Sequence, residues 1–565
     1  MCGIFASFNS MPLYDYERYF NKGRSRGPDH SIIENINDNV ILGFHRLSIN
    51  GIDKESNQPI NFNKITLICN GEIYNYKELF SLIDTSSITN SDCEIIIHLY
   101  LKYGIESTLQ MLDGVFSFVL LDNNKNTAFV ARDPFGVRPL FYFKYNNNII
   151  FSSEIKMIPT PMLDELNIYT NIKLVQFTPG NFMEIYNYKT SNAIVSYIKP
   201  YTLLPFSYSQ INCDLNSTGV LHDILENINY YFKNAVKKRC LNTDREFCCL
   251  LSGGLDSSLV CAIANKYAKH KLKTFSIGLK NSVDIINARK VATFLNTEHH
   301  EVIVSEDDFF NAIPEVIENI ESYDTTTVRA SVGNYLISKY ISETTDCKVV
   351  LNGDGADELS GGYLYFSKCN EPLEFDRECK RLLQNIHYFD VLRSDKSISS
   401  NGLEARTPFL DREFVQYYLS ISPIIRCHTF NESIEKYLIR HAFNNENLLP
   451  TEILWRRKEA FSDGVSGLNK SWSEIIQEKI EQLDVKNING LIHNVPVTKE
   501  QQYYRSIFNN YYPNCGDIIP YFWMPKYVEA HDSSARTLSL YTHVKNNPIS
   551  LPYTKEEEPW DELTI

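Results

Sequence analysis

The pattern of hydrophobic and polar positions changes character partway along the chain. Before about residue 190, short apolar runs at 40–44, 65–69 and 115–120 are bounded by Asn, Asp and Gly. Such runs predict β-strands joined by turns. Residues 92–103 instead carry apolar side chains at helical spacing. The first region is therefore predicted to be a layered sheet domain with a few helices.

From about residue 220 the pattern alternates between helix-like stretches and short apolar strands. The predicted strands are 247–251, 274–279, 301–304 and 349–351. This alternation favours a parallel sheet wrapped by helices. Between the two patterns, 190–215 is irregular and contains Pro200 and Pro205, which is typical of a linker. Because 565 residues exceed what one core accommodates, we predict two domains, 1–205 and 206–565.

Composition and charge narrow the function classes. Hydrophobic residues make up 43% and charged residues 22% of the chain, as in ordinary globular proteins. The net charge of −14, without a dense basic run, argues against a nucleic-acid partner. No apolar stretch approaches the ~20 residues of a membrane span. The thirteen cysteines form no CxxC pairs, and the N-terminus lacks a signal-peptide pattern. Together these observations indicate reduced thiols in the cytoplasm. The oligomeric state stays open, with a homodimer among the options.

The chemistry-bearing residues begin with Cys2. If Met1 is removed, Cys2 carries a thiol and a free α-amine on one carbon, and the amine can serve as the base for the thiol. The alternative interpretation is a small residue at an ordinary chain start. The segment 252–258, Ser-Gly-Gly-Leu-Asp-Ser-Ser, favours the catalytic interpretation of Cys2. It places a candidate ATP loop on the same polypeptide as a candidate amide-opening nucleophile.

Residues that could serve such a nucleophile lie at predicted strand ends. The Asn70 amide and the Gly71 backbone N–H could donate to an oxyanion, although Asn-Gly is also a common hairpin turn. Arg46 could bind a carboxylate with two parallel hydrogen bonds. Glu72 and Asp92 could hold an ammonium group. Each of these charges, taken alone, is more often a surface residue.

The front region resembles the glutaminase domain of N-terminal-nucleophile (Ntn) amidotransferases. The matching segments, in the family's order, are 2–4, 26–29, 46–49, 58–60, 70–75, 91–94 and 131–136. The resemblance implies an αββα-layered domain in which Cys2 releases ammonia from glutamine. It further implies that Asn70 and Gly71 form the oxyanion hole. The implied glutamine-binding residues are Arg46, Leu47, Ser48, Ile49, Asn50, Asn70, Gly71, Glu72 and Asp92.

Two positions depart from that family's pattern. Ser25 stands where histidine is common before Arg-Gly-Pro-Asp, and Asn50 stands where aspartate is frequent. Neither position carries a charge that the chemistry requires, so we expect the glutaminase activity to be kept.

The segment 252–258 lies between a predicted strand and a helix that starts near Asp256. Gly253 and Gly254 let backbone N–H groups surround phosphate oxygens at the helix N-terminus. The segment lacks the lysine of the GxxxxGK[ST] loop and resembles the pyrophosphate-binding loop of N-type ATP pyrophosphatases. The predicted ATP contacts are Leu251, Ser252, Gly253, Gly254, Asp256, Ser257, Ser258, Ile277, Asn352 and Gly353.

A second acidic, Gly-rich loop, 352–362, follows another predicted strand. Asp256 and Asp357 are the predicted Mg²⁺ ligands, because Mg²⁺ needs only one or two carboxylates beside phosphate oxygens. A solvated turn is the alternative. Lys436 and Lys458 are candidate cations for the triphosphate, and both stretches are predicted to be helical.

With both halves in view, the chain resembles the glutamine-hydrolysing asparagine synthetase family. The added matches are 323–331, 404–411, 455–465, 523–526 and 533–538. The resemblance implies that aspartate, glutamine, ATP and water give asparagine, glutamate, AMP and pyrophosphate. The route runs through a Cys2 thioester, a β-aspartyl-AMP intermediate and internal ammonia transfer. Thr326, Thr327 and Arg329 would contact aspartate, with Asp354 and Lys436 catalytic.

Position 354 departs from that family, since many members carry glutamate there, and Asn352 replaces a frequent serine. Other hypotheses therefore stay open. A β-lactam-forming cyclase or another amide ligase would keep both halves but change the acceptor. A phosphoribosyl or sugar-phosphate amidotransferase would lack 252–258. A sensor with a decayed site would bind without turnover.

Overall fold

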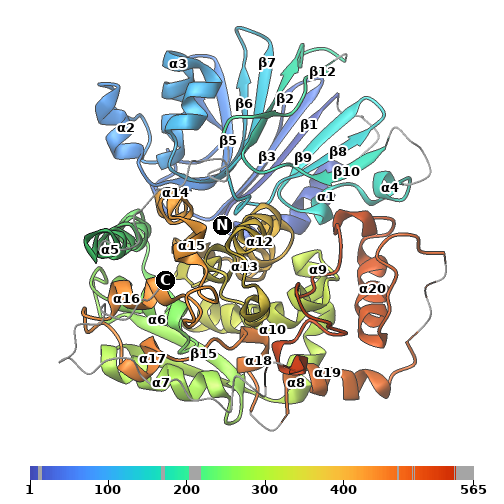
Figure 1. Ribbon diagram of the computed structural model, residues 1–565. Helices are drawn as coiled ribbons and strands as arrows, with labels where there is room; N and C mark the ends of the chain where they lie inside the picture. The colour runs from blue at the N-terminus through green and yellow to red at the C-terminus, as the bar shows by residue number, and fades with distance from the viewer. Residues whose placement is uncertain are drawn as a thin grey trace.

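The computed structural model describes residues 1–9, 15–166, 172–191, 193–202, 218–467, 470–485, 488, 490–539 and 541. The predicted boundary between residues 205 and 206 lies outside these ranges, so the domain division stays a prediction. Figure 1 shows two parts, with the N-terminal strands above and a helix-rich part below.

The N-terminal part is built on two antiparallel sheets. The first runs in the order β10 (Lys173–Gln176), β8 (Phe141–Tyr145), β9 (Asn148–Ser152), β1 (Gly3–Phe8), β3 (Val40–Arg46), β2 (His30–Asn37). The second runs β12 (Ile194–Val195), β11 (Asn181–Tyr186), β7 (Thr127–Arg132), β6 (Gly114–Asp122), β5 (Ile65–Ile73), β4 (Ile60–Phe62), with β13 (Lys199–Pro200) on β11. The predicted strands within 40–44, 65–69 and 115–120 fall in β3, β5 and β6.

Helices cover the outer faces of both sheets. An apolar layer that includes Ile4, Leu42, Ile68 and Val119 fills the space between the sheets. The helices α2 (Tyr76–Leu82) and α3 (Ile95–Met111) pack on the second sheet through a separate cluster. On the first sheet, α1 (Tyr16–Phe20) packs against Phe5. The four layers confirm the predicted αββα arrangement.

The second part contains a five-stranded parallel sheet. Its order is β16 (Glu298–Val304), β15 (Lys273–Leu279), β14 (Phe247–Leu250), β17 (Val349–Leu351), β18 (Glu404–Arg406). The strand order reverses between β14 and β17, so the loops that follow these strands diverge and open a crevice at their carboxyl ends. The predicted parallel sheet is confirmed, and its crevice receives the loops that contain residues 252–258 and 352–362.

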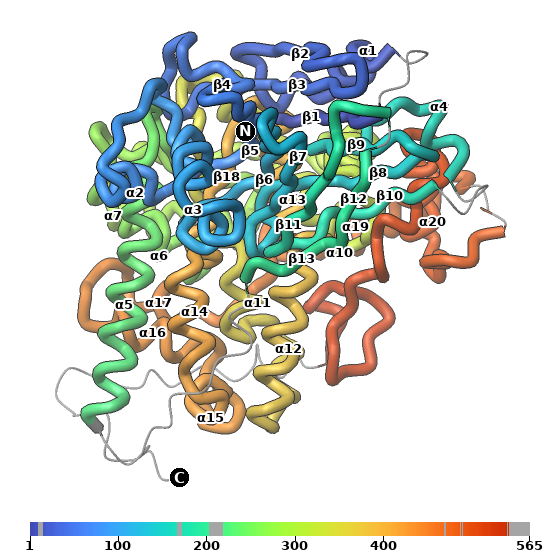
Figure 2. The backbone as a smooth tube through the Cα atoms, turned by 90° about the horizontal axis from the view of Figure 1, so that it is seen from above, coloured from blue at the N-terminus to red at the C-terminus, as the bar shows by residue number. Residues whose placement is uncertain are grey.

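Figures 1 and 2 show that the second part consists mostly of helices. They are α5 (Thr218–Leu241), α6 (Leu255–Ala264), α7 (Val283–Leu295), α8 (Glu306–Asn311), α9 (Ile313–Ile320), α10 (Thr325–Thr344), α11 (Ala356–Ser360), α12 (Pro372–Asn385), α13 (Asp390–Ser399), α14 (Arg412–Ser420), α15 (Pro423–Arg426), α16 (Tyr437–Phe443), α17 (Thr451–Leu454), α18 (Phe461–Gly464), α19 (Trp472–Glu481) and α20 (Lys499–Tyr511). A four-residue helix, α4 (Thr160–Leu163), belongs to the first part.

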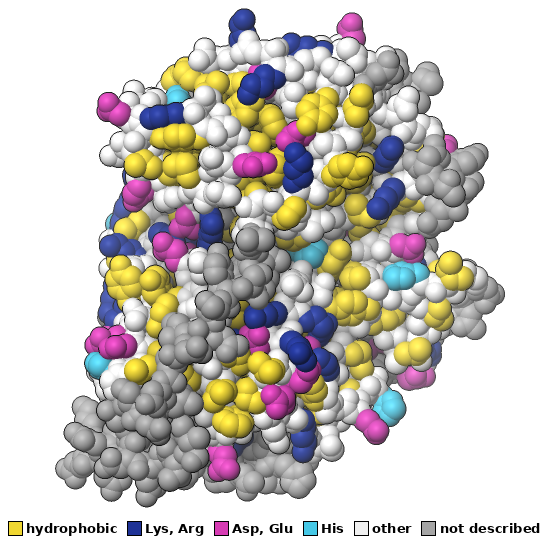
Figure 3. Space-filling view, turned by 45° about the horizontal axis from the view of Figure 1, so that its top comes forward, with side chains coloured by type: hydrophobic (Ala, Val, Ile, Leu, Met, Phe, Trp, Pro, Cys, Tyr) yellow, Lys and Arg dark blue, Asp and Glu magenta, His cyan; other side chains and the backbone are white. Residues whose placement is uncertain are grey.

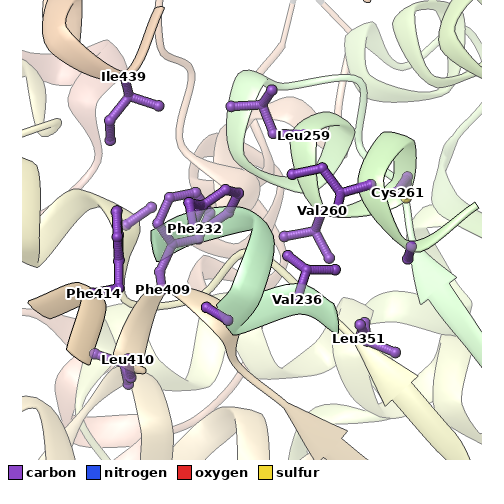
Figure 4. Close-up of a cluster of buried hydrophobic side chains, with 14 of the residues drawn as sticks. Phe232, Val236, Leu259, Val260, Cys261, Leu351, Phe409, Leu410, Phe414 and Ile439 are labelled. Carbon is purple, nitrogen blue, oxygen red and sulfur yellow. The ribbon is translucent and has the colours of Figure 1, made fainter. Parts of the chain in front are cut away.

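One apolar cluster fixes the helix that follows the ATP-loop candidate. Figure 4 shows Phe232 of α5 beside Phe414 of α14, and Val260 of α6 belongs to the same buried cluster. All three side chains are buried. Removal of this much apolar surface from water stabilises each helix by roughly 1.5–3 kcal/mol per side chain. The packing therefore holds the N-terminus of α6 rigidly below the crevice.

The two parts share an extensive buried boundary. Phe141 and Phe143 of the first sheet lie in the same cluster as Ile317 of α9 and Ile398 of α13. Met1 is buried at this boundary, and its amine donates to the carbonyl oxygen of Leu403 at 3.0 Å. Figure 1 places the N-terminus between the two parts.

Two surface properties bear on possible partners. On the face that Figure 3 displays, acidic and basic side chains are interspersed rather than gathered into a basic stripe. Among the described residues, no helix combines the length and apolarity needed to cross a membrane.

Candidate functional sites

Cys2 lies at the start of β1, beside the end of β3. Gly3 pairs with His45 across these strands, which brings Cys2 next to Arg46 and Leu47. The Cys2 thiol donates to the carbonyl oxygen of Leu47 at 3.7 Å. Burial raises the pKa of the Cys2 thiol. A protonated thiol must lose its proton to a nearby base before it can attack a carbonyl carbon.

His45, the histidine on the neighbouring strand, is not placed to be that base. Its Nδ1 lies 2.8 Å from the Ser31 hydroxyl, and its Nε2 lies 2.8 Å from the carbonyl oxygen of Phe20. Burial lowers the pKa of His45 to about 4. Burial also lowers the pKa of the Met1 α-amine to about 5, so a neutral α-amine sits at the boundary beside Cys2.

The predicted oxyanion donors lie on β5, which contacts β1 across the two sheets. Asn70 is fully buried, yet neither its Nδ2 nor its Oδ1 has a hydrogen-bond partner. A buried amide without partners costs about 1–3 kcal/mol, which indicates a group held ready for a ligand. At Gly71 an added Cβ would lie 2.4 Å from the carbonyl oxygen of Val115, so a side chain cannot fit there.

Arg46 is tied to the loop that follows it. Its guanidinium donates to the carbonyl oxygen of Asp53 at 2.7 Å, to Oδ1 of Asn57 at 2.6 Å and to the carbonyl oxygen of Gly51. Burial lowers the pKa of Arg46. A glutamine carboxylate would therefore compete with this loop for Arg46, a cost that the sequence pattern did not indicate.

The remaining predicted glutamine contacts fall into two groups. Leu47 and Ile49 are buried in the apolar cluster that joins the two parts, while the Ser48 N–H donates to Asp29 at 2.8 Å. Asn50 donates to Oε2 of Glu72 at 2.5 Å. The four consecutive residues Leu47, Ser48, Ile49 and Asn50 form the segment that follows β3.

Both predicted ammonium ligands are buried carboxylates. The Ile73 N–H donates to Asp92 at 2.7 Å. Burial raises the pKa of Asp92 to about 6, and burial with the nearby Asp92 charge raises the pKa of Glu72. Glu72 also pairs with Arg406 of β18 at 3.2 Å, so it is shared with the second part of the molecule.

Sequence patterns missed the buried arginines around this site. Arg26 donates from Nε to the carbonyl oxygen of Cys2 at 2.9 Å. Arg406 pairs with Glu404 at 2.8 Å, and Arg138 lies 3.4 Å from Glu404. Arg26, Glu404 and Arg406 lie in the family segments 26–29 and 404–411, whereas Arg138 lies outside them. Nothing in the local pattern of these segments indicates which carboxylate each arginine contacts.

A pocket occupies the crevice beyond β14 and β17. The residues predicted to contact ATP that line it are Leu251, Ser252, Gly254, Asp256, Ser257, Ile277, Asn352 and Gly353. Gly253 shapes the turn instead, and Ser258 lies buried in α6, where its hydroxyl has no hydrogen-bond partner. Gly253 has φ +72°, and an added Cβ would lie 2.4 Å from the Ala288 nitrogen. The hydroxyls of Ser252 and Ser257 lie 3.0 Å apart, which holds the loop closed on itself.

Four charged side chains meet at one wall of this pocket. Lys436 Nζ lies 2.6 Å from Asp256 Oδ2 and 2.6 Å from Asp357 Oδ1, and Lys458 Nζ lies 2.6 Å from Asp357 Oδ2. Burial opposes ionisation of Asp357, but the Lys436 and Lys458 charges outweigh it and hold the pKa of Asp357 far below its usual range. The two carboxylates converge on one point, as Mg²⁺ requires of its protein ligands.

The prediction that both lysines lie in helices is wrong. Lys436 precedes α16 in the left-handed backbone region, with φ 61°. Lys458 lies in an irregular stretch between α17 and α18. Both segments have helical composition, but a helix would direct these side chains along its own surface. The irregular backbone instead brings Lys458 into the lining of the pocket and Lys436 to the Asp256 and Asp357 carboxylates.

The predicted acyl-substrate contacts separate in the structure. Thr326 lines the pocket, and its buried Oγ1 has no hydrogen-bond partner. The Thr327 hydroxyl and backbone N–H both donate to Asp324, at 2.8 and 2.9 Å, and Asp324 caps the N-terminus of α10. Arg329 is engaged by Glu500 and Asp532 at 2.6–2.8 Å. Its guanidinium thus cross-links buried segments, and this geometry does not offer it to aspartate.

Asp354 lines the pocket and contacts a residue that sequence analysis did not single out. Its Oδ1 accepts from Arg393 at 2.9 Å, and its buried Oδ2 has no hydrogen-bond partner. Glu358, Tyr363 and Asp390 line the same wall. Asp390 and Arg393 lie on α13, in a stretch without a recognisable motif, so no local signal could have found them.

Comparisons with known proteins agree with this division into two sites. The family model described as glutamine amidotransferase domain matches residues 1–199, and the model described as asparagine synthase matches 227–374 and 368–538. The chain is 43% identical to asparagine synthetase [glutamine-hydrolyzing] of Gallus gallus and 42% identical to that of Homo sapiens. Each alignment covers 96% of this chain and 99% of the relative.

Among solved structures, the glutamine phosphoribosylpyrophosphate amidotransferase from B. subtilis matches at 16% identity with a TM-score of 0.29. That match covers 53% of this chain and 81% of that one. The full-length similarity, together with both family models, decides the assignment: the chain belongs to the glutamine-hydrolysing asparagine synthetase family.

Proposed function

We propose that this protein converts aspartate to asparagine, with glutamine as nitrogen donor and cleavage of ATP to AMP and pyrophosphate. One observation carries the proposal: a single chain holds the unpartnered Asn70 amide on β5, which contacts the strand that follows Cys2, and, across a buried boundary, the Asp256–Asp357–Lys436–Lys458 cluster in a crevice. The relatives' names give asparagine as the product and glutamine as the molecule that is hydrolysed, and aspartate is proposed as the acid from which asparagine is made.

At the first site, removal of Met1 would give Cys2 the free α-amine. That amine accepts the thiol proton, and Sγ attacks the glutamine amide carbon. The Asn70 Nδ2 and Gly71 N–H then donate to the oxyanion, each of them worth roughly 2.7–4 kcal/mol of barrier lowering in comparable sites. Ammonia leaves with the proton, and water later releases glutamate from the thioester.

At the second site, an oxygen of the aspartate side-chain carboxylate attacks the α-phosphorus of ATP. The bond to the pyrophosphate oxygen breaks, which leaves an acyl-adenylate. Lys436 and Lys458 would move from the Asp256 and Asp357 carboxylates to phosphate oxygens as ATP enters. Ammonia then attacks the acyl carbon, and AMP leaves with the bonding electron pair.

Ammonia must travel between the sites without meeting bulk water, because ammonium has no lone pair with which to attack. The boundary between the two parts is buried and contains the Glu72–Arg406 pair. This boundary supports transfer inside the protein.

Two further elements of the proposal rest on indirect support. We propose Mg²⁺ as the metal, held by Asp256 and Asp357; when bound, it would offset the negative charge of the phosphates. We also propose that the protein works in the cytoplasm. The described cysteines are free thiols, as a reducing compartment requires.

A direct assay tests the function. The full-length protein is incubated with ATP, Mg²⁺ and aspartate, with glutamine or ammonium as nitrogen donor, and AMP and asparagine are quantified. We expect one AMP for each asparagine from either donor. Absence of aspartate-dependent AMP would contradict the proposal. AMP release with a different carboxylic acid would move the protein to another class of amide ligase.

A further inference from the structure

Helix α13 (Asp390–Ser399) contacts both reaction centres. Its residues from Val391 to Ser399 are all buried. Arg393 and Ser399 are six residues apart, which corresponds to about 9 Å along a helix. In Figure 1 the helix lies just below the boundary where the N-terminus is marked. It is therefore a short, rigid element between the two sites.

The later part of α13 reaches the nucleophile through one arginine. Asp395 Oδ1 lies 2.8 Å from Nη1 of Arg26, and the Ser399 hydroxyl lies 2.9 Å from the same nitrogen. Asp395 and Ser399 are four residues apart and so share a helix face. The Nε of Arg26 donates to the carbonyl oxygen of Cys2 at 2.9 Å. The Cys2 backbone is thus held by a side chain that the second domain anchors.

The arrangement around Arg26 is fully buried. The exposed fraction of the Arg26 side chain is 0% and that of Asp395 is 1%. Glu154 of the first domain lies 3.1 Å from Arg26 Nη1, and Arg138 lies 3.6 Å from Asp395. A guanidinium can hold several acceptors at once in a fixed planar geometry. Loss of one anchor would let the guanidinium, and with it the Cys2 carbonyl, change position.

The earlier part of α13 holds the adenylation loop. Arg393 donates to Asp354 at 2.9 Å, and the Asn352 side-chain amide donates to the Ser394 hydroxyl at 2.7 Å. Because a packed helix moves as a unit, a displacement of α13 would be felt by Cys2 and by the loop at the same time.

We propose that Asp395 and Ser399 are positioning residues for Cys2, acting through Arg26, so that the second domain completes the glutamine-cleaving site. The inference rests on the proposed role of Cys2 as the nucleophile. It assigns a task in the first reaction to residues that belong to the domain of the second reaction.

The test is a double-mutant cycle in the full-length protein. Asp395→Asn, Arg26→Met and the double variant are assayed for glutamine cleavage and for asparagine synthesis from ammonium. We expect Asp395→Asn to lower kcat for glutamine cleavage about tenfold, because small displacements of a reacting group are costly. KM for glutamine and synthesis from ammonium should stay within about twofold. The double variant should be no slower than Arg26→Met, as expected for residues that act in one chain.

Ser400→Ala is the matched control, since Ser400 directly follows the same helix and its hydroxyl donates to the Ser397 carbonyl oxygen at 3.1 Å rather than to Arg26. It should cleave glutamine at the original rate. The proposal is overturned if Asp395→Asn cleaves glutamine normally, or if the two single losses multiply in the double variant.

Two further variants keep the outcome decisive. If Asp395→Asn also loses synthesis from ammonium, Ser399→Ala decides, because it removes only one hydrogen bond. A drop of about two- to threefold in its kcat for glutamine cleavage supports the proposal. An unchanged kcat for glutamine cleavage overturns the proposal. Cys2→Ala separates this inference from the proposed function. Glutamine cleavage that survives in Cys2→Ala contradicts the proposed function, whatever Asp395→Asn does.

Discussion

The two sites differ in how their buried polar groups are satisfied. At the first site, Asn70 keeps both amide atoms without partners inside a closed β-sandwich. At the second site, Asp256, Asp357, Lys436 and Lys458 form ion pairs with one another, although Thr326 Oγ1 and Asp354 Oδ2 in the same pocket lack hydrogen-bond partners. The first site is therefore arranged in advance for a developing oxyanion. The second must exchange its internal ion pairs for contacts with phosphate.

This difference indicates how each site achieves specificity. A donor fixed in a strand stabilises charge without reorganisation, which suits one reaction on one amide. A cluster of lysines paired with carboxylates is costly to separate unless phosphate and metal replace both partners. The second site should therefore be active only when fully loaded.

Loss of the nucleophile should separate the two sites with the largest effect on activity. Cys2→Ala should reduce glutamine-dependent asparagine synthesis by at least about 10³-fold, because no other group can form the thioester. Synthesis from ammonium should stay within about twofold of the original rate. Amino-acid analysis of both reactions checks this. If Cys2→Ala also abolishes the ammonium reaction in a folded protein, the two sites are not separate.

Removal of the unpartnered Asn70 amide should have the next largest effect on activity. Asn70→Ala is expected to lower kcat for glutamine cleavage by roughly 10²–10³-fold, the cost of one missing oxyanion donor. The measurement is glutamate release under saturating glutamine. A loss confined to KM would mean that Asn70 binds the ground state rather than the oxyanion.

A change at the second site should reduce asparagine synthesis from glutamine and from ammonium alike. Asp256→Asn leaves Lys436 without one of its two carboxylates and removes a proposed metal ligand. We expect aspartate-dependent AMP release to fall by about two orders of magnitude, with either nitrogen donor, because the step before ammonia attack is lost. Glutamate release should stay within a few-fold. Normal AMP release in Asp256→Asn would contradict a role for Asp256 in adenylation.

A pH profile gives the smallest and most selective effect. Burial raises the pKa of Asp92 to about 6, and Asp92 must be ionised to bind an ammonium group. As pH falls through 6, kcat/KM for glutamine should decline, by about tenfold per unit well below that pKa. Above pH 7 this dependence should vanish. Asp92→Asn should remove the bend near pH 6, and a bend that persists would assign it to another group.

Sequence alone predicted the elements whose chemistry is local. The Gly-rich turn at 252–258 needs only its own residues and the flanking strand and helix, and alternating apolar runs were enough for the layered and parallel sheets. Pairings between distant segments were beyond it. The Arg26–Asp395 and Arg329–Glu500 contacts join segments far apart in the chain, and tertiary packing alone decides them. The left-handed backbone at Lys436 likewise overrides a helical pattern.

The central claim is that ammonia made at Cys2 reaches the crevice inside the protein. An isotope competition tests it most directly. The reaction is run with glutamine labelled with ¹⁵N in its amide and with excess unlabelled ammonium in solution, and mass spectrometry measures the label in asparagine at early times. The account predicts that asparagine keeps most of the ¹⁵N. Label diluted to the ratio in bulk solution would contradict it.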